Sequence, residues 1–335
     1  MVDPQALRVV PDVADALLAR RPVVALESSV LAQGLPIPAN RTAAERMQAA
    51  VTARGAVPAI TAVVRGIPTL GLEASDLERF LRRAGVEKVS ARDLAPAMVR
   101  RIDGATTVAA ALALATLAGV SVFATGGIGG VHREVSERPS DWVRDESSDL
   151  AELARSPMVV VCAGAKSILD LRATWERLET LGVAVVGYRT SELPAFFSAE
   201  SGIKLSIRAE SAAEISTIFN AQRALKRPGA LLVVQPPPPD VALERAEVDR
   251  AVARALDEAE SEGVRGAAVT PYLLAAVERE TGGRSLTANL GLLEANAALA
   301  AEIACELAGQ GGAGSAAAAR RAGGRKDSKR VVRRS

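Results

Sequence analysis

The stretch from Ser121 to Asp170 reads SVFATGGIGGVHREVSERPSDWVRDESSDLAELARSPMVVVCAGAKSILD and contains two apolar runs that end in small residues. The first run, Val122 to Ala124, opens into Thr125 and the loop GGIGG. The second, Met158 to Cys162, leads through Ala-Gly-Ala to Lys166. Short apolar runs of this kind are typical of buried parallel strands. Because open α/β sheets bind ligands at the carboxyl edge of their strands, we expect a site where both runs end.

Further strands and helices alternate on both sides of this stretch. Apolar runs predict buried strands at Val23–Leu26, Val183–Gly187 and Ala230–Val234, and helical spacing predicts a helix over Arg41–Arg54. This alternation predicts an α/β fold with a largely parallel central sheet sandwiched by helices. Since the sequence contains neither a clear internal repeat nor a long linker, we expect a single domain over residues 1–308.

Composition limits the classes of protein to which the chain can belong. Of its 335 residues 49% are apolar, which is enough for a large buried core. Cys162 and Cys305 lie in apolar segments, so we expect free thiols in a reducing compartment. The N-terminus lacks the pattern of a secretory signal, and no apolar run approaches the ~20 residues of a membrane span. We therefore expect a cytoplasmic protein without a membrane partner.

Charge is spread unevenly along the chain. The net charge is +2, but residues 309–335 hold eight Lys and Arg residues against one acid, Asp327. This tail therefore carries +7 and the rest of the chain −5. A mildly acidic body does not favour a specific nucleic-acid-binding domain. The tail has low complexity, and we predict that residues 309–335 are disordered.

Several polar groups follow or flank the predicted strands, and most have two interpretations. Glu27 follows a strand, where a carboxylate can be a catalytic acid or base or an ordinary surface turn residue. Lys166, at the mouth of an apolar strand, can be a Schiff-base nucleophile or a phosphate-binding lysine. Lys88 on its own is most simply a solvated charge. Thr106 and Thr107 can cap a helix or help to hold an anion.

The central stretch contains further groups that can bind ligands. The loop Asp145-x-Ser147-x-Asp149 supplies oxygen ligands for Mg²⁺ or Mn²⁺, although such acids also suit a helix N-terminus. The glycines after Thr125 allow close approach of the backbone, and their amides could cradle a phosphate. Phe196 can line a pocket for a flat ring or pack in the core. These residues predict an α/β enzyme acting on a small phosphorylated molecule, with an aldolase, a glycosidase and a phosphotransferase all open.

Longer motifs occur in a fixed order between about Pro22 and Ala308. They include VALESSV, GAVPA, EKVSARDL, GATTVAA, VFATGGIGGVHR, VVCAGAKSILD, VGYRTSELPAFF, TPYLL and TGGRSLTANL. Together these motifs resemble the pseudouridine-5′-phosphate glycosidase family. Several long runs in order are far more specific than a lone glycine motif, and the basic tail lies outside the resemblance.

The resemblance implies reversible cleavage of the C–C glycosidic bond of pseudouridine 5′-phosphate to uracil and ribose 5-phosphate, in pseudouridine catabolism. It implies that Lys166 attacks C1′ of the ring-opened ribose and forms an imine-type adduct. That cation can accept electrons as the bond to uracil C5 breaks or forms. Glu27 would be the matching acid or base, and the enzyme would be a homotrimer.

The resemblance also implies ligand-binding residues. Asp145 matches the ligand of one Mn²⁺ per subunit, with water completing the shell. Substrate-binding positions match Lys88, with phosphate as its natural partner, and also Val108, Ser147, Ser148 and Asp149. Pocket roles are expected for three further residues in matching motifs, Thr125, His132 and Asn289.

Two residues depart from the usual family pattern. Gln33 occupies a position that is usually histidine, and Gln235 occupies one that is usually asparagine. Both replacements are polar and can still form hydrogen bonds, so they bear on substrate recognition more than on the chemistry. Two other functions are considered: a Schiff-base aldolase or lyase on another sugar phosphate, and a catalytically silent phosphosugar-binding protein. Release of uracil distinguishes the glycosidase from both.

Overall fold

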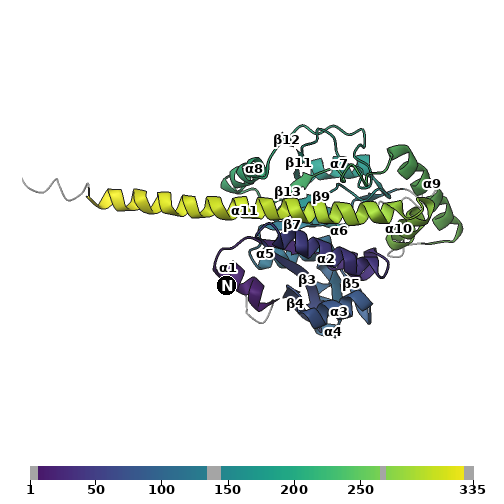
Figure 1. Ribbon diagram of the computed structural model, residues 1–335, viewed down its shortest axis with the longest axis horizontal. Helices are drawn as coiled ribbons and strands as arrows, with labels where there is room; N and C mark the ends of the chain where they lie inside the picture. The colour runs from purple at the N-terminus through teal and green to yellow at the C-terminus, as the bar shows by residue number, and fades with distance from the viewer. Residues whose placement is uncertain (1–6, 134–144, 265–268, 328–335) are drawn as a thin grey trace, which may run out of the picture.

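The computed structural model describes residues 7–133, 145–264 and 269–327, with side chains up to residue 310 (Figure 1). Its main sheet contains β1 (Arg8–Val9), β2 (Val23–Leu26), β3 (Val57–Val64), β4 (Ile67–Leu70), β5 (Val86–Val89), β6 (Asp103–Thr106), β7 (Val122–Ala124), β9 (Val159–Cys162), β11 (Ala184–Tyr188), β12 (Arg208–Ala209) and β13 (Leu231–Val234). Within the described residues the order is β1-β4-β3-β2-β7-β9-β13-β11-β12, with β6 and β5 joined to β3. A separate pair consists of β8 (Val131–His132) and β10 (Leu169–Asp170).

The helices lie on both sides of this sheet. They are α1 (Pro11–Leu18), α2 (Ala39–Thr52), α3 (Ala74–Arg82), α4 (Leu94–Arg100), α5 (Val108–Leu117), α6 (Ser148–Leu153), α7 (Leu171–Thr180), α8 (Ala212–Ala224), α9 (Arg245–Ser261), α10 (Val269–Glu280) and α11 (Arg284–Asp327). A π-helical turn, η1 (Val30–Gly34), and a 3₁₀ turn, η2 (Ala91–Asp93), follow β2 and β5.

The middle strands of the sheet explain the apolar runs in the sequence. β2, β7, β9 and β13 pair in parallel with one another, and every residue in them is buried. Strands that are covered on both faces are apolar throughout, because neither face meets water. Burying each Val or Leu side chain contributes about 1.5–3 kcal/mol. The predicted parallel sheet is confirmed, and the carboxyl ends of these strands meet at one edge.

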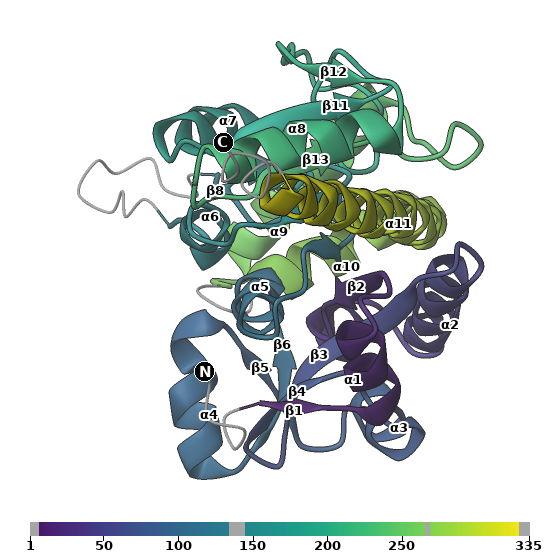
Figure 2. The same ribbon diagram turned by 90° about the vertical axis from the view of Figure 1, so that its left-hand side faces the viewer.

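Helices cover both faces of the sheet, as predicted. On one face α11 packs on β2, β7 and β9, with α2 and α8 beside it. On the other face α5 contacts β2 and β3, and α6 lies next to α5. Figure 2 shows α5 and α2 on opposite sides of the sheet. The sequence of α5, VAAALALATL, is apolar on all sides, which suits a helix buried between the sheet and its neighbours.

The last helix extends into the segment for which the sequence predicts a disordered tail. α11 crosses the body and continues past it to Asp327 (Figure 1). Residues 309–327 are therefore helical in the structure, where a disordered tail was predicted. The run Ala316–Ala319 and the arginines after it have high helix propensity, which the prediction from composition did not weigh. Residues 328–335 lie outside the described residues.

Both cysteines are free thiols, as predicted. Cys162 is buried in β9, and burial raises the pKa of its thiol to about 12. Cys305 is partly buried in α11. In the part of the chain that the structure describes, no helix combines the length and the apolar character that a membrane crossing requires.

Candidate active site

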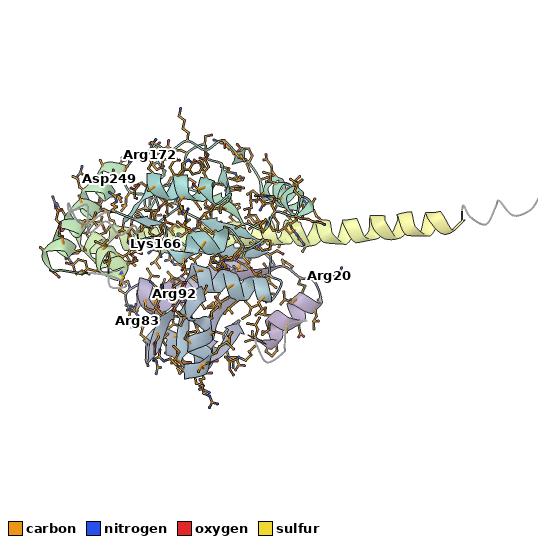
Figure 3. All side chains as sticks on the ribbon, turned by 180° about the vertical axis from the view of Figure 1, so that it is seen from behind. Arg20, Arg83, Arg92, Lys166, Arg172 and Asp249 are labelled. Atoms are coloured by element: carbon orange, nitrogen blue, oxygen red, sulfur yellow. The ribbon has the colours of Figure 1, made fainter. Side chains whose placement is uncertain are left out.

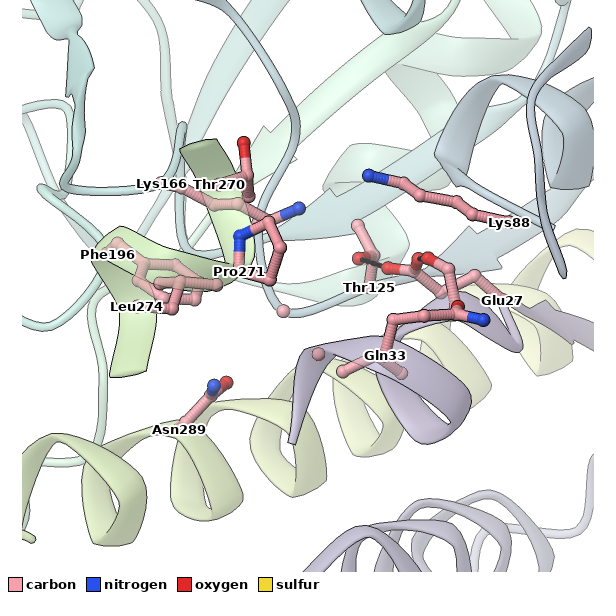
Figure 4. Close-up of a pocket in the computed structure, with 15 residues that line it drawn as sticks. Glu27, Gln33, Lys88, Thr125, Lys166, Phe196, Thr270, Pro271, Leu274 and Asn289 are labelled. Carbon is pink, nitrogen blue, oxygen red and sulfur yellow. Dashed lines mark hydrogen bonds between the residues drawn. The ribbon is translucent and has the colours of Figure 1, made fainter. Parts of the chain in front are cut away.

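A cavity of about 240 Å³ lies at the edge where β2, β7 and β9 end (Figure 4). Five of the predicted site residues line it: Glu27, Lys88, Thr125, Lys166 and Asn289. Figure 4 shows Lys88 and Lys166 extending toward each other from opposite walls. Lys166 lies in the middle of the body, between its two halves (Figure 3). The predicted meeting of strand ends at one edge is therefore seen in the structure, and a cavity lies there.

Glu27 is the first residue after β2, and only 4% of it is exposed. β2 pairs with β7 so that Leu26 lies opposite Ala124. The next residues, Glu27 and Thr125, therefore meet, and Thr125 Oγ1 donates a hydrogen bond to Glu27 Oε1. Ser29 Oγ donates to Glu27 Oε2. Glu27 is thus a buried carboxylate in a cavity wall, not a surface turn residue, and it can act as an acid or a base.

Buried hydroxyl groups fix the turn that follows β2. Thr106 Oγ1 lies 3.2 Å from Ser28 Oγ and 2.8 Å from Thr61 Oγ1. Thr106 therefore links β6 to β2 and β3 and is fully buried, so it neither caps a helix nor meets an anion. Thr107 does cap α5, because its Oγ1 accepts a hydrogen bond from Ala110 N–H at 3.5 Å.

Lys166 follows β9 on a loop that pairs with the glycine-rich loop after β7. Ile128 N–H donates to Gly164 O at 3.0 Å, and Lys166 N–H donates to Ile128 O at 3.1 Å. Gly164 has a φ of +88°, and a side chain there would overlap the carbonyl oxygen of Pro194. The two loops extend the parallel pairing of β7 and β9 and hold Lys166 in the cavity wall.

The glycine-rich loop binds a carboxylate of the protein itself. Gly129 N–H donates to Asp149 Oδ2 at 2.8 Å, and Ala109 N–H, in the first turn of α5, donates to Asp149 Oδ1 at 2.9 Å. A Cβ atom on Gly129 would overlap Ser147 Oγ, which explains the glycine. The amide of Gly129 is therefore already bonded within the protein, whereas Gly126 and Gly127 of the same loop line the cavity.

The remaining predicted residues near β5 lie around the cavity and not in its lining. Val108 is the buried first residue of α5. Ser147 caps α6, and its Oγ accepts a hydrogen bond from Asp149 N–H at 3.2 Å. Ser148 Oγ lies 2.7 Å from Ser90 Oγ, directly after β5. These contacts join the N-terminal ends of α5 and α6 to β5, so the helix-terminus interpretation of the acidic loop applies to Ser147 and Asp149.

Lys88 reaches the cavity from β5, where its side chain is exposed at the open side. Partial desolvation and the positive charge of Lys166 lower the pKa of Lys88, and the charges of Asp149 and Glu27 oppose this effect. The charges of Lys166, Asp149 and Glu27 thus all act on Lys88. In this position it is a ready partner for an anionic ligand.

His132 and Asp145 face each other beside the cavity. His132 Nε2 lies 4.0 Å from Asp145 Oδ2, and His132 N–H donates to Asp145 O at 2.9 Å. Desolvation lowers the pKa of His132; Asp145 opposes this effect, and Lys166 and Lys88 add to it. The imidazole is therefore neutral near pH 7.

The resemblance predicts Asp145 as a metal ligand. Within residues 7–133, 145–264 and 269–310, no group of three or more His, Cys, Asp or Glu side chains could hold a metal ion. The carboxylate of Asp145 is nevertheless 64% exposed and faces the neutral imidazole of His132. One carboxylate with several water molecules is a common arrangement for hard divalent cations. These groups fit an ion held mainly by water and exclude a cage of described protein ligands.

Two amide side chains in the cavity wall have an unpaired oxygen. Gln33 Oε1 and Asn289 Oδ1 are buried and have no hydrogen-bond partner among the described residues. Gln235 lies outside this lining, and its Nε2 donates to Asn296 Oδ1 at 2.9 Å. Of the two departures from the family pattern, Gln33 is therefore the one that is positioned to contact a ligand.

Several lining residues were not predicted as site residues. Thr270, Pro271 and Leu274 come from α10, and Ser29 precedes η1. The signal that could have identified the α10 residues is the family motif TPYLL, because the helical pattern alone does not indicate that α10 reaches the cavity. Phe196 lines the cavity and is also buried in the hydrophobic core, so it has features of both interpretations.

Comparison with known proteins identifies the family. A family model described as "Indigoidine synthase A like protein" matches residues 12–306. A pseudouridine-5′-phosphate glycosidase of Gemmatimonas aurantiaca is 60% identical over 300 residues, which cover 90% of this chain and 96% of that protein. The chain belongs to the pseudouridine-5′-phosphate glycosidase family. A member from Chloroflexus aurantiacus is 50% identical over 305 residues, 90% of this chain and 98% of the relative.

Solved structures agree with this family and fold. The prealnumycin C-glycosynthase AlnA, in complex with ribulose 5-phosphate, superposes with a TM-score of 0.83 at 40% identity, covering 92% of this chain and 99% of that chain. An indigoidine synthase A-like protein of Thermotoga maritima superposes with a TM-score of 0.81 at 33% identity, covering 92% and 98%. The glycosidase-like α/β fold predicted from the sequence is confirmed.

Proposed function

We propose that this protein reversibly cleaves the C–C glycosidic bond of pseudouridine 5′-phosphate to uracil and ribose 5-phosphate. The observation that carries the proposal is that Lys166 and the buried Glu27 line one cavity with Lys88. Relatives with 45–60% identity carry the name of this activity. A similar structure, the C-glycosynthase AlnA, was solved with a pentulose 5-phosphate bound.

The chemistry needs an amine nucleophile because a C–C bond cannot be broken by protonating an oxygen leaving group. In the direction of synthesis, Lys166 Nζ adds to the C1 aldehyde of ring-opened ribose 5-phosphate, and water leaves to give an iminium. The C5 electron pair of uracil then forms the bond to C1, and Glu27 removes the C5 proton. Attack of the C4 hydroxyl on C1 closes the ring and releases the Lys166 amine. Cleavage follows the same steps in reverse.

We assign the phosphate to the side of the cavity at which Lys88 lies. In the first turn of α5, the amides of Ala109 and Ala110 are already bonded to Asp149 and Thr107. The amide of Val108, beside the cavity, has no acceptor among the described residues, and we propose that it binds a phosphate oxygen together with Lys88. Asp149 then acts by holding the start of α5, without direct contact with the phosphate.

We assign the base to the wall that contains Gln33 and Asn289. Uracil and its C5 glycoside each carry two N–H donors. The two unpaired oxygens, Gln33 Oε1 and Asn289 Oδ1, are matching acceptors, and leaving them unpaired in the wall is costly. Phe196 adds an aromatic face to the same cavity. Pocket roles for Thr125 and His132 follow from the contact with Glu27 and from the closeness of His132 to both lysines.

We further propose that Asp145 holds one Mn²⁺ per subunit, with water and the neutral His132 beside it. Such an ion would supply a positive charge next to the phosphorylated substrate. We also propose a cytoplasmic homotrimer. The free thiols support a reducing compartment, and the trimer is what the family resemblance implies. Light scattering tests the trimer.

The function is tested by measuring the release of uracil from pseudouridine 5′-phosphate in the presence of Mn²⁺, with chromatography as the readout. The native protein should release uracil, whereas folded Lys166→Ala and Glu27→Gln variants should not. Lys204→Ala, which changes an exposed lysine outside the cavity, is the matched control and should be active. If the folded native protein releases no uracil, the glycosidase proposal fails; cleavage of another sugar phosphate would then favour an aldolase or lyase.

A further inference from the structure

Asn296 lies on α11 at a point where the helix covers the end of β7. Only 1% of it is exposed, and it is not in the cavity lining. Its Nδ2 donates to Thr125 O at 2.8 Å and lies 3.3 Å from Gly126 O. Its Oδ1 accepts from Gln235 Nε2 at 2.9 Å. Both the amino group and the oxygen of this buried amide are thus hydrogen-bonded.

Gln235 holds the acceptor end of the Asn296 amide. Gln235 follows β13, and its N–H donates to Cys162 O at 3.1 Å, so its backbone is fixed to the end of β9. From there its Nε2 presents a donor to Asn296 Oδ1. The carbonyl oxygens of Thr125 and Gly126 face the amino end of Asn296, so its amide is held at both ends. Without Gln235, the buried Oδ1 of Asn296 would lose its donor and the side chain would be held at one end only.

Thr125, whose carbonyl group binds Asn296, also contributes its hydroxyl group to the active site. Thr125 lies just beyond β7, and its N–H donates to Val161 O at 3.0 Å. Its carbonyl accepts from Asn296, while its Oγ1 donates to Glu27. We propose that Asn296, held in place by Gln235, is a positioning residue that sets the Thr125 hydroxyl against Glu27. This inference rests on the proposed role of Glu27 as acid or base.

The loss of turnover expected on removing Asn296 or Gln235 can be estimated from the geometry. Misplacing a catalytic group by about 1 Å can reduce turnover by about 100-fold even when the change lies outside the reacting atoms. Neither Asn296 nor Gln235 lines the cavity, so substrate binding should be largely unaffected by their loss. The expected signature is therefore a fall in kcat without a matching rise in KM.

The test compares Gln235→Met, which removes the donor at nearly constant volume, with the native protein in cleavage of pseudouridine 5′-phosphate. We expect kcat to fall by about tenfold or more and KM to change by less than about twofold. Gln222→Met is the matched control, because Gln222 on α8 also uses its side-chain Nε2 as a hydrogen-bond donor, in its case to the carbonyl oxygen of Gly229 at 2.7 Å. It should keep the native kcat.

A double-mutant cycle separates positioning from general destabilisation. In a Thr125→Val background, Gln235→Met should lower kcat by less than about twofold, because the hydroxyl that it positions is already gone. Equal losses in both backgrounds, or an unchanged kcat in the single variant, would overturn the inference. If the native protein is inactive, the proposed function has failed, and positioning is tested separately by crystal structures of the native protein and Gln235→Met. The variant should lose the Thr125–Glu27 hydrogen bond. An intact bond would refute the positioning role.

Discussion

Thr125 Oγ1 donates a hydrogen bond to Glu27 Oε1, although 98 positions separate the two residues in the sequence. The contact exists because β2 and β7 are neighbours in the parallel sheet and end at the same level. It gives a buried carboxylate a fixed donor beside the lysine pair that lines the cavity. The parallel sheet therefore assembles the site from residues that follow different strands.

Removing that donor should impair turnover. Thr125→Val keeps the shape of the side chain but leaves Glu27 Oε1 without its hydroxyl partner. A hydrogen bond to a charged group contributes about 1.5–3 kcal/mol, so kcat for uracil release should fall by roughly 10- to 100-fold. Thr125→Ser retains the hydroxyl and should stay within a few-fold of the native rate. Equal activity of the Val and Ser variants would show that the hydroxyl has no role in turnover.

Loss of the proton from Lys88 should weaken phosphate binding at alkaline pH. Desolvation and the charge of Lys166 lower its pKa from the ordinary value of 10.5, against the opposing charges of Asp149 and Glu27. A protonated Lys88 attracts phosphate, so its loss of charge on raising the pH should increase KM for ribose 5-phosphate already below pH 10.5. Steady-state kinetics of Lys88→Arg should show this increase moved to higher pH. An identical alkaline profile in that variant would argue against Lys88 as the phosphate partner.

Asp149 should matter for stability as well as for activity. Its two oxygens accept from Gly129 N–H and Ala109 N–H in a buried setting. Asp149→Asn leaves one backbone donor facing an amide nitrogen, which should lower the free energy of unfolding by about 1–3 kcal/mol. Urea denaturation measures the change. Asp12→Asn, at an exposed first turn of α1, is the control and should change stability by less than about 0.5 kcal/mol.

A second stability prediction concerns Asp76, which joins the N-terminal segment to α3. Burial alone would raise the pKa of Asp76, but hydrogen bonds from Arg79 and Arg8 lower it overall. A carboxyl with a lowered folded pKa stabilises the fold above its unfolded value of about 3.8 and loses that contribution as the pH falls through the folded value. Asp76→Ala should therefore reduce the free energy of unfolding by about 2 kcal/mol at pH 7, less at pH 3. Thermal unfolding at both pH values measures the change. An equal loss of unfolding free energy at pH 7 and pH 3 would contradict this prediction.

The sequence contained enough information to predict the sheet and its ligand edge. The apolar runs before Glu27, Thr125 and Lys166 are all buried parallel strands whose ends meet. This succeeded because continuous apolar runs and small residues at strand ends are local patterns with a physical cause. Lys166 could be identified for the same reason, although its covalent role came only from the family resemblance.

Other parts of the site could not be predicted from local patterns. In the glycine-rich loop, the amide of Gly129 binds Asp149, a partner 20 positions away that the loop sequence does not indicate. Gln235 suggested substrate recognition, but it contacts Asn296 on the last helix. Thr270 reaches the cavity only through the packing of α10. Each of these contacts depends on tertiary neighbours, which neither periodicity nor composition encodes.

The most direct test of the proposed chemistry is to trap the amine adduct and locate it. The protein would be incubated with ribose 5-phosphate, reduced with borohydride, digested and examined by mass spectrometry. We predict a reduced pentose phosphate on the peptide that contains Lys166, and the same adduct in lower yield from Lys88→Met, which keeps the nucleophile. An adduct on Lys88 in place of Lys166, or uracil release by a Lys166→Ala variant at the native rate, would contradict the assignment of Lys166 as the nucleophile.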